Sequence, residues 1–128
     1  MHCSSKGNNQ DRPISYHGCD VDTTNGAMDK DTGIFKAKKR GIYSFYFQTH
    51  VLAGKFAYVT MKKGSTALTL AGANHRKMKK TGNTFSASVL VQLERGDEVK
   101  VHLHFAGYNI YSDSYKWTIF SGFLLASM

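Results

Sequence analysis

The strongest constraint on the fold is the alternation of apolar with mainly polar side chains in the segment 41–51. Tyr43, Phe45 and Phe47 fall on one face of an extended chain, because successive side chains of a β-strand point to opposite sides. The opposite face is mostly polar, with two apolar or aromatic interruptions. The pattern predicts a strand with one dry face and one partly covered face.

Similar segments recur along the chain, separated by turn residues. We expect further strands at 56–61, 66–70, 85–93, 99–105 and 117–125. The last of these is almost continuously apolar, which is typical of a strand buried on both faces. Strands at a spacing of about ten residues, with turns such as 95–97 between them, predict an all-β sandwich or a closed antiparallel architecture.

Length and composition indicate one globular domain. The chain has 128 residues, of which 41% are hydrophobic, so it can bury a core without further support. We divide it into a polar, mobile N-terminal stub at 1–12 and a domain at 13–128. No apolar run approaches the roughly 20 residues of a membrane-spanning helix. No signal peptide is visible, which indicates either a mature form or a protein that starts inside the cell.

The charge balance favours anionic partners. Lys and Arg number 17 against 9 Asp and Glu, a net charge of +8, which suits acidic glycans, nucleic acid or an anionic surface without choosing among them. One basic cluster is a candidate binding site: His75, Arg76, Lys77, Lys79 and Lys80. It is equally consistent with a solvated loop. A second cluster favours the solvated interpretation: Lys36, Lys38, Lys39 and Arg40.

A second candidate binding segment lies at 105–116, which is rich in Tyr, Ser, Asp and Asn. Sugar binding needs flat aromatic faces beside rigid polar groups, and Tyr108, Tyr111 and Tyr115 supply such rings. The alternative is that these rings belong to a core or to an interface between chains.

The two cysteines, Cys3 and Cys19, lie close together in the sequence. They can close one N-terminal loop, link two chains or remain free, and the sequence leaves these alternatives open.

Signals for catalysis or metal binding are weak. His102 and His104 share one face of an expected strand, but no third metal ligand is identifiable, so we expect no metal site there. There is no Gly-x-Ser-x-Gly elbow and no phosphate-binding glycine loop. We therefore expect a binding protein rather than an enzyme.

Three motifs carry a resemblance to a known family. The first runs from Asn25-Gly26 through Thr32-Gly33-Ile34-Phe35 to the aromatic strand, the second covers 93–99, and the third covers 120–125. In this order and spacing they resemble the globular-head domain of the complement C1q family, over about residues 14–125. The resemblance implies a jelly-roll β-sandwich of about ten antiparallel strands, related in shape to tumour necrosis factor.

The resemblance also implies assembly and setting. Family members form compact trimers through aromatic and aliphatic faces, so we expect a secreted homotrimer. The residues assigned to its core or interface are Phe35, Tyr43, Phe45, Phe47, Phe120 and Phe123. Some members bind calcium through loop carboxylates, which makes calcium possible here, and the carboxylates available are Asp20, Asp22, Asp29 and Asp31. The EF-hand spacing is absent.

The sequence departs from the family in two places. An N-terminal strand with an aromatic-Ser-Ala motif is absent or replaced, and Lys38-Lys39-Arg40 stands where a proline is common. The collagen-like stalk of the complement protein is missing, which argues against a complement-initiating role. The segment 25–33 is similar to that of stalkless invertebrate recognition proteins, including sialic-acid-binding lectins.

The sequence therefore predicts a secreted, multivalent pattern-recognition lectin of innate immunity that binds anionic or sialylated glycans or microbial surface polymers. The alternative is a trimeric signalling or scaffold ligand that binds a protein receptor or extracellular matrix. We expect neither nucleic-acid binding nor membrane insertion.

Overall fold

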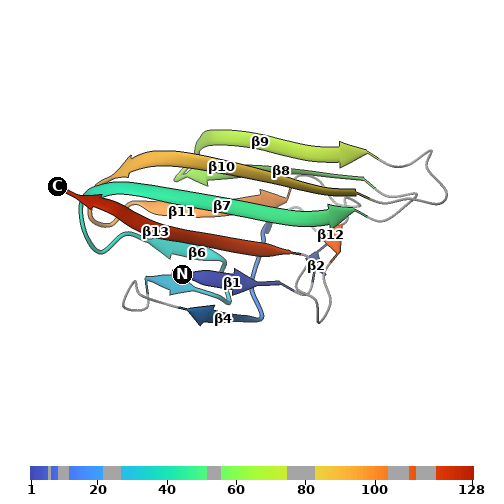
Figure 1. Cartoon of the computed structure of the whole chain (residues 1–128), viewed down its shortest axis with the longest axis horizontal. Helices are drawn as coiled ribbons and strands as arrows, with labels where there is room; N and C mark the ends of the chain where they lie inside the picture. The colour runs from blue at the N-terminus through green and yellow to red at the C-terminus, as the bar shows by residue number, and fades with distance from the viewer. Residues whose placement is uncertain are drawn as a thin grey trace.

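The computed structural model of the chain consists mainly of two antiparallel sheets (Figure 1). The structure describes residues 1–128 except 6, 9–11, 22–26, 52–55, 75–82, 104–109 and 112–117. The strands of the described residues are β1 (His2–Ser4), β2 (Gly7–Asn8), β3 (Arg12–Pro13), β4 (Gly18–Val21), β5 (Met28–Asp29), β6 (Ile34–Lys36), β7 (Gly41–Val51), β8 (Phe56–Lys63), β9 (Thr66–Asn74), β10 (Asn83–Leu93), β11 (Glu98–Leu103), β12 (Ile110–Tyr111) and β13 (Ile119–Ser127). The described residues contain no helix that is long and apolar enough to cross a membrane.

The topology places strands from distant parts of the chain side by side. The first sheet has the order β2-β12-β7-β13-β1-β4, and β10 also pairs with β7. The second sheet has the order β5-β6-β11-β8-β9, and β3 also pairs with β11. The long strands run side by side along the longest axis of the molecule (Figure 1). This arrangement confirms the predicted all-β jelly-roll class.

The core lies between the sheets and is built from the alternating faces of their strands. Phe45 and Phe47 of β7 are fully buried, as is Val101 of β11. Phe35 of β6 meets Phe45 edge to face with ring centroids 5.2 Å apart, which joins the second sheet to the first. Aromatic pairs at this spacing contribute beyond their buried area. Phe120 of β13 stacks on Phe45 at 5.6 Å, so one aromatic cluster spans both sheets.

The first residues of the chain, which we expected in a polar stub, form part of the first sheet. β1 lies between β13 and β4, with Cys3 opposite Phe120 on one side and opposite Cys19 on the other. Met1 and Cys3 are buried. The division at residue 13 therefore does not separate these residues from the domain. A strand of three residues is too short to show a periodic pattern in the sequence.

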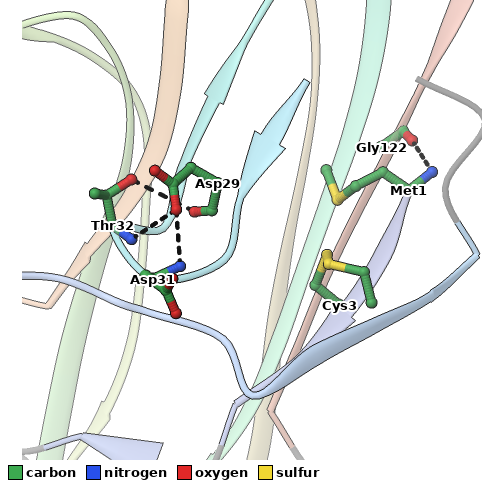
Figure 2. Close-up of a disulfide and its surroundings, with 7 residues drawn as sticks. Met1, Cys3, Asp29, Asp31, Thr32 and Gly122 are labelled. Atoms are coloured by element: carbon green, nitrogen blue, oxygen red, sulfur yellow. Dashed lines mark hydrogen bonds between the residues drawn. A yellow bond between two sulfur atoms is a disulfide. The ribbon is translucent and has the colours of Figure 1, made fainter. Parts of the chain in front are cut away.

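A disulfide joins Cys3 to Cys19 across β1 and β4. Figure 2 shows Cys3 near Met1, whose amine donates a hydrogen bond of 3.0 Å to the Gly122 carbonyl. Of the three cysteine states that the sequence leaves open, the structure contains the intrachain bridge.

The strand at the C-terminus differs from its prediction. We expected 117–125 to be buried on both faces, but Phe123 and Leu125 are 51% and 55% exposed in the single chain. The alternation explains this difference, because Phe120 faces the core while Phe123 faces outward. In the single chain these outward apolar side chains stay in contact with water, and only packing against another molecule would bury them.

Candidate functional site

Five long strands begin or end together at one end of the sandwich. Val51 at the end of β7 lies opposite Asn83 at the start of β10, and Phe56 at the start of β8 lies opposite Asn74 at the end of β9. Leu103 ends β11 on the same side, and the arrowheads of β7 and β9 point to this end at the right of Figure 1. We call it the loop end.

Both predicted binding segments leave the sandwich at the loop end. The basic cluster follows Asn74 directly and precedes Asn83, and the tyrosine segment follows Leu103. The candidate side chains themselves lie outside the described residues: His75, Arg76, Lys77, Lys79, Lys80, Tyr108, Tyr111 and Tyr115. For Tyr111 the backbone is described, in β12, opposite His50 of β7. Their role in binding stays a prediction.

The described side chains at the loop end include one polar pair. His50 Nδ1 lies 3.1 Å from Thr84 Oγ1, on the outward side of the first sheet. Both residues are cross-strand neighbours in the β7–β10 ladder. The sequence drew attention to neither, because a single His and a single Thr on two distant strands form no motif.

The outward face of the first sheet carries exposed apolar side chains. Leu90 of β10 and Phe123 of β13 both lie opposite Ser44 of β7, one on each side. Leu90 is 64% exposed, and Leu125 lies further along β13. We call this set of three apolar side chains the apolar outer face. Of the six aromatic residues assigned to the core or an interface, five are buried and Phe123 alone faces outward.

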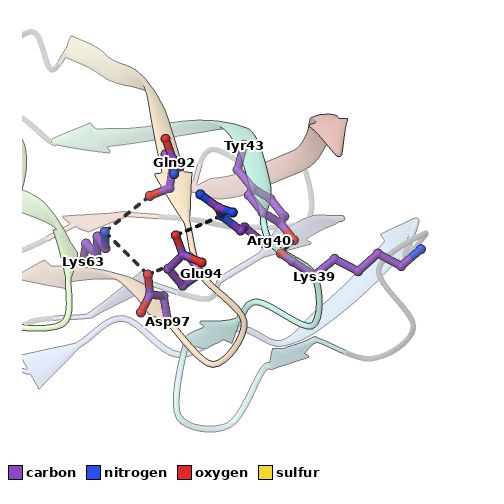
Figure 3. Close-up of polar contacts among 7 residues, drawn as sticks. All are labelled: Lys39, Arg40, Tyr43, Lys63, Gln92, Glu94 and Asp97. Atoms are coloured by element: carbon purple, nitrogen blue, oxygen red, sulfur yellow. Dashed lines mark hydrogen bonds and ion pairs between the residues drawn. The ribbon is translucent and has the colours of Figure 1, made fainter. Parts of the chain in front are cut away.

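The opposite end of the sandwich, at the β10–β11 turn, holds a set of polar contacts (Figure 3). Arg40 Nε donates to Glu94 Oε1 at 3.1 Å, and Lys63 Nζ lies 3.5 Å from Asp97 Oδ2. We call this the hairpin end. Arg40, a member of the cluster interpreted as solvated, thus has a structural partner. Exposed pairs of this kind contribute about 0–1 kcal/mol each.

A cavity of about 570 Å³ opens at the hairpin end. Its lining residues are Ala27, Asp29, Thr32, Ile34, Lys36, Ala37, Lys38, Arg95, Gly96 and Glu98. The volume is within the range of small-ligand sites. The sequence gives no signal for this cavity, because a turn near residue 30 and a hairpin more than sixty residues away line it together, and no motif connects them.

The carboxylate of Asp29 on this cavity is already engaged. Its Oδ1 accepts hydrogen bonds from the backbone N–H groups of Asp31 at 3.0 Å and Thr32 at 3.3 Å (Figure 2). Asp29 therefore shapes the β5–β6 turn, as aspartates commonly do. Gly33 completes this turn with φ of 75°, a conformation that favours glycine.

The described residues contain no cluster of side chains at the positions considered for metal binding. No three His, Cys, Asp or Glu side chains gather there as a metal ion requires. His102 lies on the outward face of β11, and its predicted companion His104 is outside the described residues. Asp22 is also outside them. Calcium binding stays an expectation from the resemblance.

Comparison with known proteins identifies relatives of the whole domain. Residues 2–125 match the family described as C1q domain. Mouse collagen alpha-1(X) chain is 34% identical over 101 residues, covering 78% of this chain and 14% of that protein. Zebrafish Caprin-2 is 34% identical over 118 residues, covering 90% of this chain and 12% of that protein. The chain thus spans only a small part of these relatives.

Solved structures share the fold at low sequence identity. The globular domain of zebrafish complement 1qA matches with a TM-score of 0.75 and 19% identity, covering 99% of this chain and 98% of that one. The Eiger TNF of S. frugiperda matches with a TM-score of 0.75 and 14% identity, covering 99% and 92%. Both likenesses concern the fold alone.

Proposed function

Because this chain belongs to the C1q domain family, we propose that it is a secreted recognition module that binds anionic glycans or microbial surface polymers through its loop end. The proposal concerns binding rather than catalysis.

The observation that carries the proposal is that the two candidate segments leave the sandwich at the same end. A basic stretch at 75–80 and a tyrosine-rich stretch at 105–116 are far apart in the sequence, yet the strands that bear them end at the same end of one sandwich. Cations supply attraction to carboxylate or sulfate, and aromatic rings supply flat faces for sugar C–H groups. A rigid scaffold with adaptable end loops is a common arrangement for binding sites.

Self-association is the second part of the proposal. The apolar outer face exposes Leu90, Phe123 and Leu125 on the two strands that flank β7, and burial against further copies of the chain would remove them from water. We propose a homotrimer, which presents three loop ends to one surface. Three weak sites on one assembly then gain affinity through effective concentration.

The disulfide supports the secreted setting. Cys3 and Cys19 are bonded, and disulfides persist mainly in oxidising compartments outside the cytosol.

A glycan array tests the proposal. Binding of the intact protein to sialylated, sulfated and neutral glycans is measured at low and physiological salt. The test variant, called the loop variant, is Arg76→Gln with Lys79→Gln. The matched control, Lys30→Gln with Lys39→Gln, removes the same charge from exposed positions away from the loop end.

We expect selective binding that survives physiological salt and that falls about tenfold in the loop variant, since each lost charged contact costs about 0.5–1 kcal/mol. Inverting one hydroxyl of the preferred sugar should also abolish binding, because a buried partner is left unpaired. Binding to every anion that disappears with salt, or an equal loss in the control variant, would contradict the proposal. An array with no binding at either salt concentration would favour a protein receptor instead.

A further inference from the structure

Three lysines lie together on the outward face of the second sheet. Lys100 of β11 lies directly opposite Lys62 of β8 and opposite Ile34 of β6 on its other side. Lys36, two residues beyond Ile34, lies opposite Glu98. The core-facing residues of these strands are buried, whereas all three lysines have the opposite parity and are exposed or half-buried. We call Lys36, Lys62 and Lys100 the lysine face.

The acidic residues nearby are already paired with other groups. At the hairpin end, Glu94 pairs with Arg40 and Asp97 with Lys63 (Figure 3). The Asp29 carboxylate accepts backbone hydrogen bonds. In the described part of the chain, none of the ion pairs includes Lys36, Lys62 or Lys100. Two acidic residues of the described strands adjoin the lysine face: Glu98 opposite Lys36, and Asp29 opposite Ile34. Because no ion pair of the described residues joins them to the three lysines, the face keeps an excess of positive charge.

The pairing of Lys62 with Lys100 is unfavourable by itself. Side chains directly opposite on antiparallel strands have Cβ atoms about 5 Å apart, and like charges at such positions destabilise the sheet. An anionic ligand that lies between them would relieve this repulsion. Lys36 is a diagonal neighbour of Lys100, at about 7–8 Å between Cβ atoms, so the three charges form a row.

The row leads into the cavity at the hairpin end. Lys36 belongs both to this face and to the cavity lining, whose other charged residues are Lys38, Arg95, Asp29 and Glu98. The cavity has an apolar floor at Ala27 and Ala37, which are buried. A guanidinium and two lysines suit sulfate or carboxylate groups, and the Glu98 carboxylate accepts from sugar hydroxyls.

We infer that the lysine face and the adjoining cavity bind a linear sulfated polysaccharide, with its anionic groups along the row and one sugar unit in the cavity. The site is separate from the loop end, because the β8–β9 and β10–β11 turns near it lie at the other ends of the same strands. Among the described residues, no aromatic ring lines the cavity, whereas single-stranded nucleic acid is bound by stacking on such rings. A polysaccharide therefore fits these residues better than single-stranded nucleic acid does.

Binding of a fluorescent heparin octasaccharide to the intact protein tests the inference across a series of NaCl concentrations. The test variant is Lys62→Gln with Lys100→Gln, and the loop variant serves as the matched control because it removes the same charge from the other end. We expect about tenfold weaker binding in the test variant and a salt dependence whose log–log slope falls by about 2, one for each lysine. The loop variant should bind the octasaccharide with the same affinity as the parent protein.

A second variant separates loss of binding from loss of folding. Lys62→Glu replaces the like-charge pair with an opposite-charge pair, so we expect the melting temperature to rise by about 2 °C while the octasaccharide is lost. A misfolded variant would show the reverse change in melting temperature.

The outcomes distinguish this inference from the proposed function. Unchanged octasaccharide affinity in Lys62→Gln with Lys100→Gln, or loss in the loop variant alone, would overturn the lysine face and leave the loop-end proposal standing. Loss in the test variant, together with binding on the glycan array that the loop variant keeps, would support the lysine face and contradict the loop end. A short single-stranded DNA that binds as tightly as the octasaccharide would overturn the polysaccharide assignment.

Discussion

Tyr16 packs its ring on Phe120 with centroids 5.8 Å apart, but its buried hydroxyl has no hydrogen-bond partner in the described structure. A buried polar group without a partner costs about 1–3 kcal/mol. We therefore expect Tyr16→Phe to raise the free energy of unfolding by about 1 kcal/mol, measured by urea denaturation. Tyr43→Phe is the matched control, because the Tyr43 hydroxyl donates to the Lys39 carbonyl at 2.7 Å and its loss should destabilise the fold. A destabilised Tyr16→Phe protein would refute this account.

The same residue predicts a dependence on pH. Burial raises the pKa of the Tyr16 hydroxyl well above its ordinary value of 10.0. The folded state thus keeps the proton after the unfolded state has lost it, so stability is complete below pH 10.0 and falls as the pH rises beyond that value. Tyr16→Phe has no hydroxyl to ionise, so this contribution to the fall in stability at high pH is absent from the variant. We expect the stability difference between the two proteins to widen above this pH in urea titrations, and a constant difference would contradict the assignment.

At the scale of single elements, β13 depends on a glycine at its centre. Gly122 lies opposite Phe45, and a Cβ added at Gly122 would overlap the Phe45 ring. We expect Gly122→Ala to lower the free energy of unfolding by about 1–3 kcal/mol, as overpacking of a core usually does. The control is Gly18→Ala, because a Cβ at Gly18 meets nothing within 4 Å. Equal effects of the two substitutions in denaturant unfolding would argue against this packing.

The sequence predicted the long strands because each buries one face over many residues. The alternation at 41–51 corresponds to β7, whose burial alternates along its whole length. The short strands β1, β5 and β6 escaped notice, because two or three residues cannot show a period and their pairing comes from distant segments.

The candidate sites also differ in whether the sequence alone can reveal them. Sequence reasoning can find the basic stretch at 75–80, because its charges are contiguous. It cannot find the lysine face, whose members lie on three strands and meet only through the register of β6, β8 and β11. Lys36 was interpreted as part of a solvated cluster, and its sequence neighbours do not reveal the cavity that it lines.

At the scale of the whole molecule, the two outward faces of the sandwich are chemically different. The face of the first sheet is apolar at Leu90 and Phe123, whereas that of the second sheet is basic at Lys62 and Lys100. Association through the apolar face covers the first sheet and does not by itself require contact with the basic face, which lies on the second sheet. An assembly that leaves both sites accessible would multiply the loop ends and the lysine faces together.

This arrangement gives a prediction for the assembly itself. Leu90→Glu with Phe123→Glu places two carboxylates on the apolar outer face, and burying them unpaired against another copy is strongly unfavourable. Both side chains are more than half exposed in the single chain, so its fold should persist. Light scattering should show three times the mass of the chain for the parent protein and a single chain for the variant. Ser65→Glu with Thr66→Glu, at the exposed β8–β9 turn, adds equal charge and should leave the trimer intact. A parent protein that is monomeric, or a variant that remains trimeric, would show that this face is not the interface.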